Sequence, residues 1–185
     1  MSPMSTIPPT IARSLLLLPA DKPEKFEDAA NSEVDVVVLD VEDGCRQSEK
    51  ERARREVRQW LEAGNHAWIR INDVRSPEWE KDLMALGHCP GIDGVMLAKT
   101  ENPEHVALTA SRLAPKTPIV ALVESADGLA QAAEIAKSDQ VVRLAFGVGD
   151  FRRDTGIGAS QIALAYTRSQ FVVASATWAL AMLFS

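Results

Sequence analysis

The chain has 185 residues, of which 46% are hydrophobic and 25% are charged, so it can form one globular domain with a sizeable core. Its net charge of -6 disfavours a nucleic-acid binder, because contact with phosphate requires a basic surface. Its two cysteines form no CxxC pair, which favours a reduced cytoplasmic protein over a disulfide scaffold. The uncharged stretch after Arg168 is shorter than the ~20 residues of a membrane helix, so we expect no membrane association.

Apolar runs and helical patterns alternate along the chain. Residues 1–12 are rich in Pro, Ser and Thr and predict a flexible tail, so we expect one folded domain over residues 13–185. The apolar runs are nearly continuous, which is typical of strands that are covered on both faces. The expected strands are Ser14–Pro19, Asp35–Asp40, Ala67–Ile71, Gly94–Ala98, Ile119–Val123 and Val141–Gly147.

The segments between the runs have helical spacing. Arg46–Glu62 predicts a helix because Ala53, Val57 and Leu61 share one face. The same spacing predicts a helix over Ala126–Lys137, and a long apolar helix is expected from Ser160 to about Leu180.

Two architectures fit this alternation. A doubly wound sheet normally has a glycine-rich turn after its first strand, whereas the turn Pro19–Pro23 has no glycine. Polar residues instead follow several successive strands, as at the mouth of a TIM barrel. We therefore predict an α/β fold of the TIM (β/α)8 type with about six β/α units. Because eight units take about 250 residues, we expect the barrel to be incomplete at its C-terminal end.

Two acids close apolar runs near the end of this array. Glu124 follows Pro118–Val123, and Asp150 closes Leu144–Asp150. Their strands should be neighbours, so the two carboxylates can converge on Mg²⁺, which keeps water and substrate oxygens in its other positions. The alternative is that each acid caps the helix that follows it.

A basic residue, Arg70, lies within the otherwise apolar strand Ala67–Ile71. Because an unpaired buried guanidinium is costly, Arg70 must meet an anion. The anion is either an acid at the rim or a substrate carboxylate or developing enolate, and the two interpretations are compatible.

Three acids, Asp40, Glu42 and Asp43, crowd the end of the second strand. They repel one another unless cations or backbone donors balance them. We expect them to orient Arg70, Lys99 or a metal-bound water. Lys99 follows the fourth strand, where it either neutralises these acids or forms a Schiff base with a carbonyl substrate.

Six motifs in this order resemble the citrate lyase beta subunit-like group of the HpcH/HpaI aldolase superfamily. They are Arg13–Pro19, Leu39–Asp43, Ile69–Asn72, Leu97–Lys99, Leu122–Ser125 and Ala145–Asp150. The resemblance covers about Arg13 to Ser175. It implies a TIM barrel that cleaves or forms a carbon–carbon bond in a 3-hydroxyacyl thioester, with Mg²⁺ as cofactor. It also implies a coenzyme A or acyl-carrier-protein substrate and a homo-oligomer, either a trimer or a hexamer.

The resemblance assigns roles by position. It implies that Glu124 and Asp150 hold the metal and that Arg70 binds the substrate. Glu124 and Lys99 are further candidates for substrate binding, and Glu42 and Asp43 join Arg70 as candidates for catalysis. The first loop approaches the nucleotide carrier in this family, which makes its residues candidates for carrier binding: Pro19, Asp21 and Lys22.

The chain departs from the family pattern at three places. Ala20 replaces the usual glycine of the carrier loop. Asp43 stands where the related metal-dependent pyruvate aldolases have a histidine, which favours the thioester lyases. Family members continue through a seventh and an eighth strand, so we expect this chain to be a truncated member.

Three functions remain open from the sequence. The first is a Mg²⁺-dependent lyase that acts on a citryl, malyl, citramalyl or methylmalyl thioester. The second is a non-catalytic or partner-dependent subunit of a lyase complex. The third is an aldolase that works through a Lys99 Schiff base.

Overall fold

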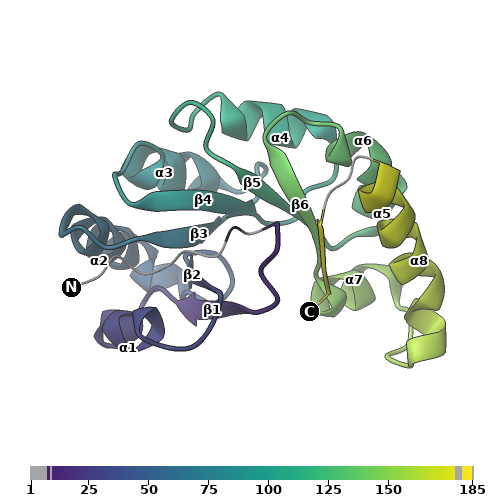
Figure 1. Cartoon of the computed structure of the whole chain (residues 1–185), viewed down its shortest axis with the longest axis horizontal. Helices are drawn as coiled ribbons and strands as arrows, with labels where there is room; N and C mark the ends of the chain where they lie inside the picture. Colours follow the sequence, from purple (N-terminus) through teal and green to yellow (C-terminus); the bar gives the residue numbers. More distant parts are fainter. Residues whose placement is uncertain (1–7, 9, 178–180, 185) are drawn as a thin grey trace.

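A computed structural model of the protein describes residue 8, residues 10–177 and residues 181–184. Its strands form one parallel sheet in the order of the sequence, from β1 to β7. Their bounds are β1 Leu15–Pro19, β2 Val36–Asp40, β3 Ala67–Ile71, β4 Ile92–Leu97, β5 Ile119–Val123, β6 Val141–Phe146 and β7 Ala181–Phe184. The parallel strands form part of a barrel, and Figure 1 shows the helices along the outer side of the sheet.

Helices follow the strands in turn. Their bounds are α1 Phe26–Ala30, α2 Lys50–Glu62, α3 Pro77–Leu86, α4 Pro103–Ala110, α5 Ala126–Ala130, α6 Ala132–Ala136, α7 Val148–Thr155 and α8 Gln161–Thr177. Short 3-10 turns, η1 Pro23–Lys25 and η2 Gln47–Glu49, precede α1 and α2. The predicted α/β alternation is therefore confirmed.

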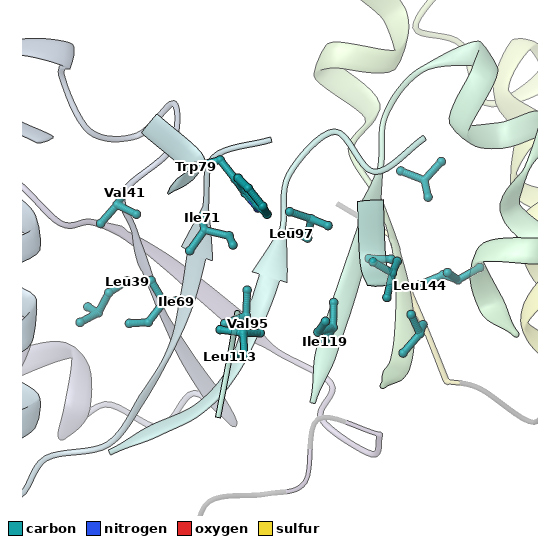
Figure 2. Packing of buried hydrophobic residues seen from close by; sticks show 14 of the residues in the cluster. Leu39, Val41, Ile69, Ile71, Trp79, Val95, Leu97, Leu113, Ile119 and Leu144 are labelled. Carbon is teal, nitrogen blue, oxygen red and sulfur yellow. The ribbon is translucent and has the colours of Figure 1, made fainter. Parts of the chain in front are cut away.

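Side chains on the two faces of the sheet enter two different cores. Leu39, Ile69, Leu97 and Ile119 pack with helix residues such as Trp79 in the larger cluster, which lies between sheet and helices (Figure 2). The smaller cluster contains no helix residue. It consists of Ala12, Val36, Val38, Trp68, Met96, Val120, Leu122 and Ala145. Because side chains alternate along a strand, this second cluster lies on the inner face of the barrel.

The six expected strands are confirmed to within two residues at each end, but the last part of the chain differs from expectation. The predicted helix from Ser160 ends at Thr177, and a seventh strand, β7, pairs with β6. The sequence of β7 is apolar but lacks β-branched residues, so its pattern could not be separated from that of a helix. Of the expected tail, residues 1–7 and 9 lie outside the described part, and Ala12 is buried.

The helix predicted over Ala126–Lys137 is two short helices that meet at Gln131. Gly128 lies within the first of them, and a Cβ there would lie 2.6 Å from the carbonyl oxygen of Thr100. The close backbone approach favours glycine, which weakens the helix. Among the described residues, no helix is long and apolar enough to cross a membrane.

A buried polar network fixes the outgoing end of β3 against α2 and α3. Asp82 is fully buried and accepts hydrogen bonds from Arg54 Nε at 2.7 Å and from the amide nitrogens of Asn72 at 2.9 and 2.7 Å. Lys50 Nζ donates to Asn72 Oδ1 at 2.6 Å, and Arg54 also pairs with Glu78. These contacts hold the segments that carry the rim of the barrel.

We expect Asp82→Ala to lower the free energy of unfolding by about 3–5 kcal/mol, because it leaves the Arg54 guanidinium buried with one partner lost. The control is Asp139→Ala in an exposed turn, which should change stability by less than about 0.5 kcal/mol. Denaturant unfolding of both variants checks this. Equal stabilities would contradict the structural role of the network.

Candidate active site

The carboxyl ends of the strands surround a cleft of about 430 Å³. Four of the predicted residues line it: Asp43, Lys99, Glu124 and Asp150. They come from four different strand ends, so the parallel sheet brings together residues that are distant in sequence.

Glu124 follows β5 and is almost completely buried, with 5% of its surface exposed. Its Oε1 accepts a hydrogen bond from the backbone N–H of Lys99 at 2.9 Å. A Cβ at position 147 would lie 2.2 Å from Glu124 Oε2, so Gly147 leaves the space that this carboxylate occupies. Burial raises the pKa of Glu124 to about 7, and the Glu42 charge adds to this against the influence of Lys99 and Arg70.

Asp150 lies in the first turn of α7, after the end of β6 at Phe146. The prediction that it closes the strand itself was therefore wrong, because the chain turns into a helix from Val148 onwards. The Asp150 carboxylate contacts the Arg153 guanidinium one helical turn away, and Lys99 Nζ lies 3.6 Å from its Oδ2. Asp150 nevertheless faces the same cleft as Glu124.

Lys99 has a left-handed backbone conformation, with φ of 47°. Its Nζ contacts Glu42 Oε1 and lies 3.1 Å from Asp43 Oδ2. Burial alone would lower the pKa of Lys99, but the hydrogen bonds and charges of Glu42 and Asp43 outweigh this and raise the pKa. The charged ammonium favours the neutralising role over a Schiff-base role, which needs a free amine.

Arg70 is held at the end of β3 by Asp40. Its Nε donates to Asp40 Oδ1 at 2.8 Å and its Nη2 donates to Oδ2, while its Nη1 lies 3.4 Å from Glu42 Oε2. Asp40 also accepts the backbone N–H groups of Glu42 and Gly44, each at 2.9 Å. A Cβ at Gly44 would lie 2.1 Å from Asp40 Oδ2, so a second glycine makes room for a carboxylate.

The predicted carrier-binding residues lie apart from the cleft and do not line it. Pro19 ends β1 and is partly buried, and Lys22 is exposed. The Asp21 carboxylate is turned inward, where Arg46 Nε donates to it at 2.9 Å and lowers its pKa. Arg46 lines a second polar cavity of about 400 Å³, which also includes Glu42, Asp43 and Lys99.

Sequence reasoning missed five residues that line the cleft: Arg75, Glu101, Ser125, Arg153 and Asp154. Arg75 pairs with Glu101 at 2.7 Å across two strand ends, and Asp154 accepts the backbone N–H of Ala126 at 2.8 Å. One signal was available for Arg153, because it stands three residues after Asp150 on one helix face.

The pair Glu124 and Asp150 fits a magnesium ion better than a transition metal. In the described ranges, no three His, Cys, Asp or Glu side chains lie close enough to enclose a metal. Mg²⁺ does not require such a cage, since it is commonly held by one or two carboxylates and keeps its waters. Oxygen donors in a cleft with free volume suit this ion, whereas zinc sites usually include His nitrogen or Cys sulfur ligands.

Most of the chain is similar in sequence to curated proteins. A citrate lyase subunit beta-like protein of Mycobacterium tuberculosis is 37% identical over 146 residues, which are 79% of this chain and 51% of the relative. A (3S)-malyl-CoA thioesterase of Cereibacter sphaeroides is 28% identical over 148 residues, which are 78% of this chain and 51% of that protein. The chain thus spans about half the length of these relatives.

The fold has a solved counterpart in a citrate lyase beta subunit of M. tuberculosis complexed with oxaloacetate and magnesium. The two structures superpose with a TM-score of 0.80 at 32% sequence identity, over 92% of this chain and 76% of the other. The HpcH/HpaI aldolase/citrate lyase family profile matches residues 13–183. As its six motifs predict, the chain belongs to the HpcH/HpaI aldolase/citrate lyase family.

Proposed function

We propose that the protein is a Mg²⁺-dependent carbon–carbon lyase that cleaves a 3-hydroxyacyl thioester of the citryl-, malyl- or citramalyl-CoA type. The products are an acyl thioester and a 2-oxo acid. The observation that carries this proposal is the meeting of Glu124 and Asp150 in one cleft with Lys99 beside them. The magnesium and oxaloacetate of the M. tuberculosis structure, and the malyl-CoA substrate of the C. sphaeroides relative, support the same chemistry.

The metal ligands in this proposal are Glu124 and Asp150. When bound there, the ion supplies Lewis-acid polarisation of substrate oxygens. Gly147 and the backbone N–H of Lys99 set the position of the Glu124 carboxylate before any ligand arrives.

Arg70 is the proposed donor to the thioester oxygen that gains negative charge as the bond breaks. Asp40 fixes its guanidinium through two hydrogen bonds, which orients the group in advance. A preorganised donor stabilises developing charge without reorganising at the moment of reaction. The partly exposed Arg70 side chain, with 14% of its surface accessible, is still open to a substrate.

Glu42 and Asp43 are the proposed proton carriers. Removal of the proton from the 3-hydroxyl group turns C3 into the carbonyl carbon of the 2-oxo acid, the C2–C3 bond breaks, and its electron pair passes to the thioester enolate. The proton then returns to the enolate carbon, which gives the acyl thioester. Glu42 Oε2 is buried, lies 3.4 Å from Arg70 Nη1 and makes no hydrogen bond within the described residues, so it keeps a lone pair for a proton beside the arginine.

The loop containing Pro19, Asp21 and Lys22 is the proposed contact for the thioester carrier, either coenzyme A or a carrier protein. Arg46 connects this loop to the polar cavity next to the cleft. A homo-oligomer, trimeric or hexameric, and a cytoplasmic location remain predictions. A partner-dependent subunit is the alternative to an independently active enzyme.

With malyl-CoA and Mg²⁺, we expect stoichiometric formation of a 2-oxo acid and acetyl-CoA without release of free thiol. Chromatography of the thioesters, hydrazone trapping of the oxo acid and a thiol assay measure this. Free thiol with malate would show a thioesterase instead, as in the C. sphaeroides relative. Magnesium binding without either product would favour the partner-dependent subunit.

The affinity for Mg²⁺ should rise about tenfold between pH 6 and pH 8, because a carboxyl group with a pKa of about 7 must lose its proton to bind the ion. The raised pKa of Glu124 also makes the stability of the metal-free protein depend on pH. Its contribution to the free energy of unfolding is fully present below pH 4.5 and is lost as the pH rises through about 7. Calorimetric titration at both pH values checks the affinity. Glu124→Gln should weaken binding at least about tenfold and abolish the pH dependence, whereas exposed Glu104→Gln should change neither.

We expect Gly147→Ala to displace the Glu124 carboxylate, because the new Cβ would lie 2.2 Å from Oε2. Magnesium affinity and kcat should both fall by about tenfold or more, through the loss of positioning. The matched control is Gly149→Ala, where a Cβ meets nothing within 4 Å. Equal losses in the two variants would show a general effect of alanine in this segment rather than a clash with Glu124.

A further inference from the structure

Lys99 carries the ammonium group that lies among the acids of the cleft. It contacts Glu42, lies 3.1 Å from Asp43 and lies 3.6 Å from Asp150. A single ammonium group therefore contacts three carboxylates from two segments of the chain. Two of these, Glu42 and Asp43, belong to the loop after β2, and the third is a proposed metal ligand.

The backbone of Lys99 has a separate task. Its N–H group holds Glu124 Oε1 at 2.9 Å, and its φ of 47° lies in the left-handed region that side-chain-bearing residues rarely adopt. The surrounding structure must hold this conformation in place. A substitution that keeps a side chain at position 99 therefore retains the contact to Glu124 while changing the charge.

The Lys99 side chain also stands between two cavities. Lys99 and Asp43 line both the cleft of about 430 Å³ and the polar cavity of about 400 Å³. On the side of the polar cavity, the Lys99 ammonium is paired with Glu42, which is buried. It can thus leave Asp150 and still be paired.

We propose that the Lys99 ammonium is an internal counter-cation that a divalent ion displaces from Asp150, an inference that rests on the magnesium site proposed above. A cation on Asp150 and an ammonium 3.6 Å from the same oxygen repel each other strongly in a partly buried cleft. On metal binding, Lys99 keeps its contacts with Glu42 and Asp43 and gives up Asp150. Lys99 therefore weakens metal binding and at the same time holds the acids together when no metal is bound.

The proposal predicts two effects of opposite sign for Lys99→Met. The affinity for Mg²⁺ should rise about tenfold or more, because a competing positive charge is gone. The free energy of unfolding of the metal-free protein should fall, because the acids at the rim then share one cation fewer. A lysine that serves the metal site only as a structural support would produce the opposite change in affinity.

Calorimetric titration with MgCl₂ alone tests the proposal on the full chain. Lys99→Met and the polar neutral variant Lys99→Gln should both bind more tightly than wild type, while Lys99→Arg, which keeps the charge, should not. The matched control is Lys116→Met, because Lys116 is an exposed lysine with the same left-handed backbone and a φ of 67°. Its affinity should equal that of wild type.

The outcomes separate this inference from the proposed function. Unchanged or weaker binding by both neutral variants, with wild type binding and Glu124→Gln impaired, overturns the counter-cation and leaves the metal site intact. Absence of binding by wild type and by every Lys99 variant overturns both. Binding by the neutral variants alone supports the counter-cation, since it shows that Lys99 suppresses the site.

Discussion

The cost of keeping carboxylates out of water governs the rim of this barrel. Each buried acid there is matched by a cation or by backbone N–H groups: Asp40 by Arg70, Glu42 by Lys99, and Asp82 by Arg54. Glu124 differs because a backbone N–H group, rather than a side-chain cation, forms its hydrogen bond. Burial raises the pKa of Glu124 to about 7, whereas for the exposed Asp43 desolvation is outweighed by the hydrogen bond and charge of Lys99, which lower the pKa.

The pairing of buried acids with cations and backbone N–H groups also links the fold to the chemistry. Parallel strands in sequence order deliver their carboxyl ends to one edge, so β2, β4, β5 and the start of α7 contribute acids to one region. The polar network of Asn72, Lys50 and Asp82 fixes the end of β3 at this edge against α2 and α3. In the proposed function, the acids of this edge would hold the divalent ion, and Arg70 would stabilise the negative charge that develops on the substrate.

Much of the fold was predictable because periodicity is local. Continuous apolar runs located the six first strands, and the residues after them gave Glu124, Lys99 and Asp43 as neighbours in the cleft. The strand β7 was missed because an apolar run without β-branched residues has no distinctive period. The ion pairs were not predictable in detail, since the choice between Asp40 and another acid for Arg70 depends on the register of β2 and β3. The inward turn of Asp21 towards Arg46 likewise depends on a contact across the fold.

Two glycines that carry no chemistry decide where two of the carboxylates can lie. Gly44 faces Asp40 and Gly147 faces Glu124, each across a gap that a single methyl group would close. Anyone transplanting this set of acids onto another β/α scaffold would have to move the glycines with them. A designed copy with the right acids and alanine opposite would keep the composition of the rim and lose its geometry.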